Sequence, residues 1–178
     1  MNLQIRPATL ADIPALEELI RESVSGLSAE YYTARQIASA LSHVFGLDTQ
    51  LIVDETYFVA EIENQLAGSG GWSKRKTLFG GDRSKGDRID PLLDSALEAA
   101  RIRAFYVHPR WSRQGIASRI LTVCEEAARL SGFSKVELLA TLPGEPLYAA
   151  RGYTKAEAMQ IETPDGESLM GFRMTKML

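Results

Sequence analysis

Apolar and polar positions alternate along several short stretches of the chain and recur at helical spacing along others. The stretches that predict strands lie at residues 3–6, 56–62, 66–72, 102–108, 134–139, 153–161 and 168–177. Helical spacing predicts helices at residues 9–26, 29–45, 116–130 and 147–151, with a further short helix at 92–100. Together these elements predict an α/β protein with a mixed, mostly antiparallel sheet and helices on both faces.

The stretch from residue 102 to 130 combines a strand, a cationic turn with a glycine, and a helix. Pro109 has no amide hydrogen and therefore ends the strand. The start of a helix presents backbone N–H groups without partners and a partial positive charge, which suits a phosphate. Gly115 lets a diphosphate approach the backbone, while Arg113 and Arg119 add positive charge. This order of elements therefore predicts a pyrophosphate site.

Two short motifs make this prediction more specific. The central strand ends in the letters VHP at 107–109, and the letters SRQGIA follow at 112–117. A second run, LYAARGY at 147–153, places a tyrosine ahead of a Gly-Tyr pair. Both motifs resemble the GNAT (GCN5-related N-acetyltransferase) superfamily, whose acyl-CoA-binding pattern has the glycine of position 115 and the small residue of position 117. Ser112 stands where that pattern usually has Arg or Gln.

The resemblance implies a single domain over residues 1–178 with the GNAT acyl-CoA N-acyltransferase fold. It implies an N-acetyltransferase that moves an acetyl group from acetyl-CoA directly to a primary amine, with no covalent enzyme intermediate. The donor-binding residues it implies are Phe105, Tyr106 and Val107 for the pantetheine arm, and Arg113, Gln114, Gly115, Ile116, Ala117 and Ser118 for the diphosphate. A main-chain N–H within 105–107 would polarise the carbonyl.

Tyr148 is the candidate proton donor to the thiolate of CoA, because a phenol with a pKa near 10 can protonate a thiolate as it forms. Tyr153 is expected in the core. The general base stays open between Glu137, Glu145 and a water chain. His108 is left out because, by resemblance, it points away from the acceptor.

The acceptor side carries fewer signals. By resemblance, the first two helices form one wall of the acceptor cleft, where Glu22, Tyr31, Tyr32 and Trp72 are candidate lining residues. A small-molecule or a peptide amine would fit, and the acyl group could be acetyl or longer. The alternative function is a catalytically silent acyl-CoA-binding sensor or scaffold on the same fold. A nucleotide-binding domain is disfavoured because the chain lacks a Gly-X-Gly-X-X-Gly or Gly-Lys-Ser/Thr loop.

Two segments depart from simple strand and helix patterns. Gly68, Gly70 and Gly71 within one predicted strand indicate a bulge or a close approach of the backbone to another group. The polar, glycine-rich segment at about 73–99 is expected to be a long loop insertion. It would be a loop exposed to solvent, a lid over the acceptor, or a homodimer contact.

Composition narrows the partners. The 178 residues carry 20 Lys plus Arg against 23 Asp plus Glu, a net charge of −3, so no nucleic acid is expected. One cysteine and two histidines argue against a structural metal site, and the lone Cys124 is expected to be a buried apolar residue on its helix. No run of 18 apolar residues and no apolar signal core are present, which predicts a cytoplasmic protein without a membrane partner.

Overall fold

The computed structural model describes residues 2–178, and its centre is one twisted sheet of seven strands. The strands are β1 (Leu3–Pro7), β2 (Tyr57–Ile62), β3 (Gln65–Ser73), β4 (Ala100–Val107), β5 (Lys135–Thr141), β6 (Thr154–Glu162) and β7 (Ser168–Met177). Their spatial order is β1-β2-β3-β4-β5-β7-β6. Neighbours pair antiparallel except for β4 and β5, which run parallel. The predicted mixed, mostly antiparallel sheet is confirmed.

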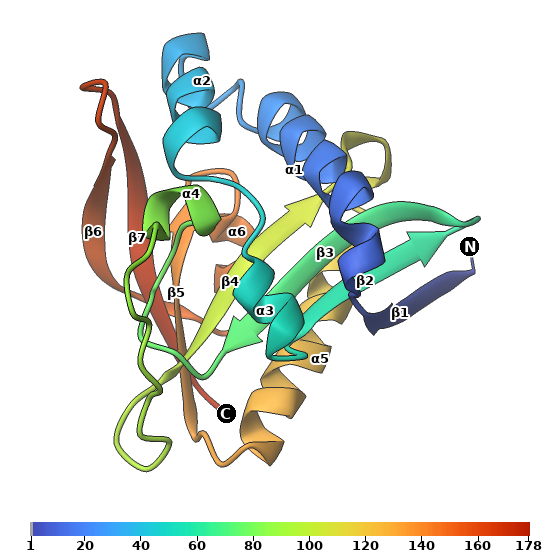
Figure 1. Ribbon diagram of the computed structural model, residues 1–178, viewed down its shortest axis with the longest axis vertical. Coiled ribbons are helices and arrows are strands. Elements are labelled where there is room, and N and C mark those ends of the chain that lie inside the picture. The colour runs from blue at the N-terminus through green and yellow to red at the C-terminus, as the bar shows by residue number, and fades with distance from the viewer. Residues whose placement is uncertain (1) are drawn as a thin grey trace.

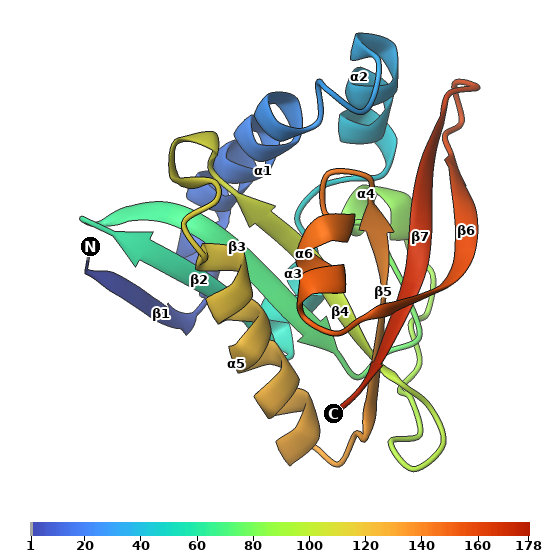
Figure 2. The same cartoon turned by 180° about the vertical axis from the view of Figure 1, so that it is seen from behind.

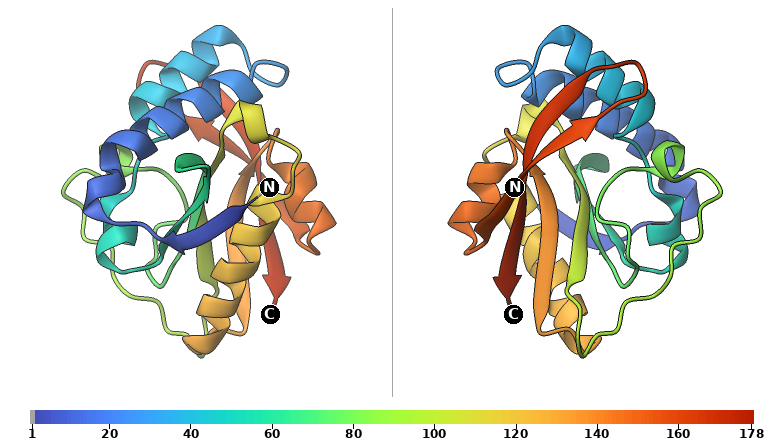
Figure 3. Two further views of the ribbon diagram at one scale, coloured as in Figure 1. Left: turned by 90° about the vertical axis from the view of Figure 1, so that its right-hand side faces the viewer. Right: turned by 90° about the vertical axis from the view of Figure 1, so that its left-hand side faces the viewer.

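Helices cover both faces of this sheet, as predicted. They are α1 (Ile13–Leu27), α2 (Ala34–His43), α3 (Thr49–Val53), α4 (Asp82–Lys85), α5 (Ile116–Leu130) and α6 (Glu145–Ala150). In Figure 1 α1, α2 and α3 lie in front of the sheet, and in Figure 2, the reverse view, α5 and α6 lie in front. Figure 3 shows the sheet between these two layers. No helix among residues 2–178 is both long and apolar enough to cross a membrane.

Two of the predicted helices differ in the structure. The expected helix at 29–45 begins only at Ala34, because Thr33 and Gln36 form a reciprocal capping box. Residues 29–33 instead form a turn. The expected short helix at 92–100 is wrong. Residues 95–98 form a turn closed by the Glu98 amide on the Asp94 carbonyl at 2.8 Å, and Ala100 already belongs to β4.

The two faces of the sheet carry separate hydrophobic clusters. On one face Ile116, Ile120 and Cys124 of α5 are fully buried, which confirms the expectation for the lone cysteine. On the other face the buried stripe of α1, with Leu16 and Ile20, packs on β2. Because both faces are buried, the side chains that alternate along β4 point into different clusters.

The glycines of β3 serve the close contacts that their pattern predicted. A Cβ on Gly68 would lie 2.9 Å from the Ile116 side chain, and one on Gly70 would lie 2.7 Å from the Phe105 ring. The pairing of β3 with β4 also shifts register between Ser69 and Gly71. The strand therefore has both the irregular pairing and the close approach that were expected.

The parallel pair at the centre of the sheet is short. Residues pair between β4 and β5 only at Ala100 with Val136 and at Arg101 with Glu137. Beyond this point the two strands diverge, as Figure 2 shows, and β4 presents an open edge. Ala104, just past the point of divergence, has a positive φ of 55°. Divergence at the middle of a sheet leaves unpaired backbone groups beside an open space.

The segment between β3 and β4 is folded against the rest of the protein. Arg75 forms an ion pair with Asp54 at 2.6 Å, and its backbone bridges to Leu92. The Thr77 amide donates to the Asp90 carboxylate at 2.8 Å. The short helix α4 follows Gly81, whose amide bonds the Val44 carbonyl behind α2. These bonds hold residues 78–80 near the end of α2.

Candidate active site

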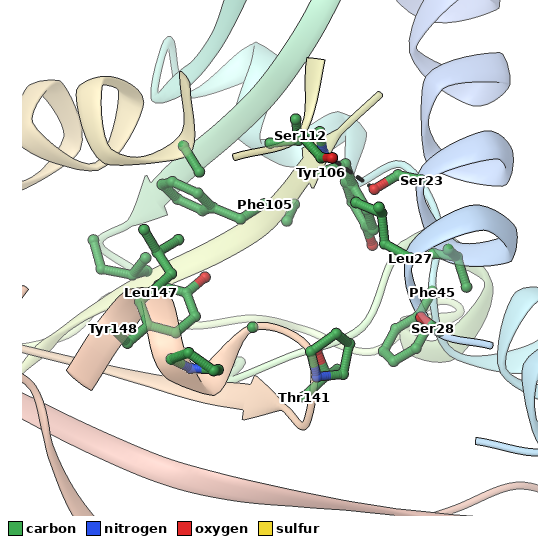
Figure 4. A pocket seen from close by; sticks show the side chains of 18 of the residues that line it. Ser23, Leu27, Ser28, Phe45, Phe105, Tyr106, Ser112, Thr141, Leu147 and Tyr148 are labelled. Carbon is green, nitrogen blue, oxygen red and sulfur yellow. Dashed lines mark hydrogen bonds between the residues drawn. The ribbon is translucent and has the colours of Figure 1, made fainter. Parts of the chain in front are cut away.

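A cavity of about 690 Å³ lies where β4 and β5 diverge. Figure 4 shows Phe105, Leu147 and Tyr148 on one side of it, and Leu27 and Phe45 on the side nearest α1. Its walls come from the end of α1, the start of α5, α6, both diverging strands, and residues 45–46 and 78–80. Segments far apart in the sequence therefore meet at the open edge of β4.

The start of α5 supplies a row of unpaired amides. The first backbone bond of this helix is donated by Arg119 to Gly115 at 3.1 Å. Within residues 2–178, none of the six consecutive backbone N–H groups of 113–118 has a hydrogen-bond partner. Arg113 and Gly115 have positive φ angles of 62° and 79° and turn the loop into the helix. Such a row of amides at the positive end of a helix can hold an anion.

Most of the predicted diphosphate residues line the cavity, with one exception. Arg113, Gly115, Ile116, Ala117 and Ser118 do so. Gln114 does not, and its side-chain amide instead donates to the Arg110 carbonyl at 3.4 Å.

Arg119, the second expected cation at the start of α5, is exposed and does not line the cavity. The positive charge on this side of the cavity is therefore that of Arg113, together with the helix end.

The backbone of β4 forms the wall between the two ends of the cavity. It includes Phe105, Tyr106 and Val107, the residues that the family resemblance implies as contacts of the pantetheine arm. Burial raises the pKa of the Tyr106 phenol to about 12, so this side chain is neutral at physiological pH. The Val107 amide already donates to Ser23 Oγ of α1 at 3.1 Å. Sequence reasoning missed Ser23, which no motif marks and which only the packing of α1 on β4 brings to the site.

Tyr148 projects from α6 into the cavity (Figure 4). Its ring packs edge-on against Phe105 and Tyr153, with ring centres 6.2 and 5.6 Å away. Burial raises the pKa of its phenol well above the usual value of 10, so it is protonated at physiological pH. Within residues 2–178 its hydroxyl has no hydrogen-bond partner and is free to meet a ligand.

Tyr153 lies in the core, where sequence analysis expected it, and its hydroxyl donates to Glu125 at 2.9 Å.

Neither candidate base from the sequence reaches the cavity. Glu137 forms ion pairs with Arg101 and Arg173 on the sheet, and Glu145 pairs with Lys155 at 3.1 Å. Among residues 2–178, Glu30 in the turn before α2 is the one acidic residue that lines the cavity. It belongs to no motif, and only the path of the turn brings it there.

The four acceptor-cleft candidates also separate. Tyr31 lines the cavity. Tyr32 is buried elsewhere, with its hydroxyl donating to the Met170 carbonyl at 2.6 Å. Trp72 packs in the core on Phe133, with ring centres 6.0 Å apart. Glu22 pairs with His108 at 2.7 Å, outside the cavity lining. The core positions of Tyr32 and Trp72 result from tertiary packing, which no local pattern in the sequence reveals.

The cavity wall near α1 is mostly apolar, and its lining includes Val24, Leu27, Phe45, Leu78 and Phe79. One cation, Arg103, also lines this part of the cavity, although it is only 4% exposed.

Arg103 forms an ion pair with Asp48 at 2.9 Å, and Lys85 pairs with the same carboxylate. Arg103 therefore already has a buried carboxylate partner, but it shares that single negative charge with Lys85.

The family model for the acetyltransferase (GNAT) family matches residues 16–153. The chain belongs to this family. The matched range includes most of α1, the row of amides at α5 and Tyr148, so it covers the walls of the cavity described above. The resemblance that the two motifs indicated is thereby confirmed, and the chain is a member of an N-acetyltransferase family.

Individual relatives agree with this assignment. A phosphinothricin N-acetyltransferase from Streptomyces viridochromogenes is 26% identical over 159 residues, which cover 85% of this chain and 74% of the relative. A GCN5-related N-acetyltransferase structure from Rhodopseudomonas palustris has a TM-score of 0.75 at 17% identity, covering 100% of this chain and 97% of that one. The structure of yncA from Salmonella typhimurium with its cofactor acetyl-CoA has a TM-score of 0.65 at 17% identity, covering 99% and 94%. These structures share the GNAT fold.

The site of this GNAT chain has donors that suit an acyl-CoA. CoA carries a diphosphate, which matches six unpaired amides beside a cation. A Cβ built on Gly115 would meet no protein atom within 4 Å, so the backbone there faces open space. Among residues 2–178 no three His, Cys, Asp or Glu side chains gather as a metal site would require.

Proposed function

We propose that this chain transfers the acetyl group of acetyl-CoA directly to a primary amine. The row of unpaired amides at 113–118, placed at the point where β4 and β5 diverge, is the observation that supports this most. A diphosphate bound there leaves the open edge of β4 to guide the pantetheine arm toward Tyr148. Acetyl-CoA supplies an activated acyl group as a thioester, so the protein needs no nucleophile of its own.

The protein contributes chiefly by orientation. Holding an amine and a thioester carbonyl in reacting geometry can contribute roughly 7–11 kcal/mol in favourable cases. The amides of 113–118 fix the diphosphate, and the edge of β4 at Phe105 and Val107 fixes the arm. The Phe105 amide, which has no partner on β3, is the proposed donor to the thioester oxygen.

Tyr148 completes the transfer as a general acid. The amine nitrogen forms a bond to the carbonyl carbon while the C–S bond breaks, and the departing sulfur takes the phenolic proton. The nitrogen of the new amide releases its second proton to water, and the tyrosine is reprotonated from that water. Its raised pKa keeps the phenol in the acid form that this role requires.

The acceptor ammonium must lose a proton before it attacks. Glu30 is the acidic side chain at the cavity, and it lies in a turn at the surface. We propose that the proton leaves through water toward Glu30, which also attracts the cationic amine. Glu137 and Glu145 take no part, because neither lines the cavity.

The acceptor is proposed to carry its amine on an apolar body. The wall formed by Leu27, Phe45 and Phe79 offers apolar contacts. Arg103 also lines this part of the cavity, but its guanidinium is already paired with the buried Asp48 carboxylate, so a carboxylate of the acceptor would have to compete with that pair.

The alternative is a silent acyl-CoA sensor or scaffold on the same fold. The scaffold is favoured because neither Glu137 nor Glu145 lines the cavity. Among residues 2–178, Glu30 and water then remain as the candidates for the base. The solvent-accessible, unpartnered hydroxyl of Tyr148 favours the enzyme.

Thiol release from acetyl-CoA with a panel of primary amines decides between them. We expect amine-dependent release, matched by acetylated product in mass spectra. Tyr148→Phe should lower kcat about a hundredfold, the scale typical of a lost general acid. Tyr153→Phe, which removes a buried tyrosine hydroxyl outside the cavity, is the control. Tight acetyl-CoA binding without release on any amine would establish the scaffold instead.

A further inference from the structure

Tyr57 of β2 is a tyrosine whose hydroxyl lies entirely inside the protein. Its side chain is 0% exposed, within the cluster that joins α1 and α3 to the sheet. The hydroxyl oxygen lies 2.9 Å from Ser69 Oγ and 3.2 Å from the Ala104 carbonyl oxygen. A phenylalanine ring would fill the same apolar space, so packing alone does not account for this hydroxyl.

The two contacts form a directed chain. A phenol has one O–H donor, and a backbone carbonyl only accepts. Both contacts are therefore satisfied when Ser69 donates to Tyr57 and Tyr57 donates to the Ala104 carbonyl. Ser69 is itself 0% exposed, so water does not compete for either group. This chain of hydrogen bonds ends on one carbonyl of β4, that of Ala104.

That carbonyl belongs to a bulge in β4. Ala104 and Phe105 lie opposite the single residue Gly70, between the pairs that Arg103 and Tyr106 form with β3. Ala104 has a φ of 55°, a left-handed conformation that disfavours residues with a Cβ. A strained peptide of this kind persists where its surroundings hold it. The hydrogen bond from Tyr57 is such a restraint.

The restraint also sets the direction of the next amide. In a trans peptide the carbonyl of one residue and the N–H of the next point in opposite directions. The Ala104 carbonyl points toward Tyr57 on the α1 face of the sheet. The Phe105 N–H is therefore turned toward the opposite face, where the Phe105 ring packs on Tyr148. The amide and the candidate acid share that side of the cavity.

We propose that Tyr57 is a positioning residue for acetyl transfer: its hydroxyl holds the Ala104 carbonyl so that the Phe105 N–H points at the thioester oxygen. Ser69 supports Tyr57 in this orientation. The proposal rests on the proposed acetyltransferase function. In this role, residues of β2 and β3 control the orientation of the Phe105 N–H of β4, although neither strand lines the cavity.

Tyr57→Phe and Ser69→Ala test this role in the full chain. Thr56→Val is the matched control, because it removes a buried hydroxyl from the neighbouring residue, whose partner is the Leu51 carbonyl at 3.3 Å. Three quantities are measured: kcat and KM for acetyl-CoA, the acetyl-CoA Kd by calorimetry, and the carbonyl stretching frequency of bound ¹³C-labelled acetyl-CoA. The frequency reports polarisation of the carbonyl without turnover.

Tyr57→Phe is expected to lower kcat about tenfold or more, since a displaced oxyanion donor is costly. KM and Kd should stay within about twofold, and the carbonyl stretch should move toward its value in free acetyl-CoA. Ser69→Ala should shift the same quantities in the same direction by less, and Thr56→Val should shift none.

Active wild-type protein whose Tyr57→Phe variant keeps kcat and the carbonyl frequency would overturn the positioning role alone. Equal losses in Tyr57→Phe and Thr56→Val would do the same, because they would show a general effect of a lost buried hydroxyl. Wild-type protein that releases no thiol would overturn the proposed function and this role with it.

Discussion

The two ends of the cavity are formed by different parts of the chain. At the end formed by α5 and β4, six backbone amides and an open strand edge face the space. At the end formed by α1, residues 45–46 and residues 78–80, side chains such as Leu27, Phe45 and Phe79 form the wall. The first end depends on backbone geometry, and the second depends on which side chains are present.

This difference explains what each end tolerates. A site made of amides keeps its donors when side chains change, so Ser112 in place of the usual Arg or Gln removes none of the N–H groups. A wall of side chains changes its specificity with every substitution. Under the proposed function, binding of the donor therefore depends little on side-chain identity, while the choice of acceptor depends on the side chains of the opposite wall.

The largest expected effect is a loss of stability when the buried ion pairs of Asp48, next to the acceptor end of the cavity, are broken. Asp48→Asn leaves Arg103 and Lys85 without their shared carboxylate, and breaking a buried pair typically costs about 3–5 kcal/mol. Urea unfolding measures the loss. Glu126→Gln, which removes an exposed pair with Arg129, should leave the midpoint unchanged. A stable Asp48→Asn protein would show that the network does not support this wall.

At the donor end, Gly115→Ala should weaken acetyl-CoA about tenfold, as measured by KM and by Kd. The added Cβ would project into the space where the diphosphate is proposed to lie, and the φ of 79° disfavours alanine. Gly166→Ala is the matched control, because Gly166 has a φ of 88°, is equally open, and lies in the turn between β6 and β7. If both variants weakened acetyl-CoA equally, the effect would be one of stability.

A smaller effect is expected from an acceptor carboxylate. We predict that 2-phenylethylamine has a kcat/KM about fivefold above that of L-phenylalanine, which differs from it by one carboxylate, because Arg103 is already paired. Steady-state thiol release measures both. Glu30→Gln should reduce this preference for the cationic amine by removing the one acidic lining residue among 2–178. A preference for the amino acid would contradict the apolar acceptor.

The smallest expected effect concerns the pH profile of kcat. Ionisation of Tyr148 should cause no fall in kcat at alkaline pH. Since burial raises the pKa of this phenol, its acid form persists above the pH at which a free tyrosine ionises. Between pH 8 and about 10, kcat should therefore not fall through loss of the acid. A kcat that declines within this range in wild-type protein, but not in Tyr148→Phe, would contradict the role of Tyr148 as an acid.

The sequence located the cavity residues of α5 and β4 better than those near α1, for a physical reason. A strand, a proline, a glycine turn and a helix are local features, so residues 102–118 could be placed without knowing the fold. Glu30, Ser23 and Phe79 reach the cavity only through tertiary packing, and no local pattern marks them.

The same limit explains the expectations that failed. The helix at 92–100 had apolar residues at suitable spacing, but the bridge between Arg75 and Leu92 draws its start into extended backbone. Tyr32 and Trp72 are aromatic residues that a cleft or a core could equally hold, and burial assigned both to the core. The bulge at Ala104 had no marker in β4 itself, since alanine rarely adopts a positive φ.

The contribution of the α5 amides is tested most directly by following backbone amide resonances while CoA is added. We expect the largest shifts on the six amides of 113–118 and on the Phe105 amide, with the Gly166 amide unchanged. Shifts that avoid 113–118 while CoA binds would contradict this expectation, because the diphosphate would then be held somewhere other than at the start of α5.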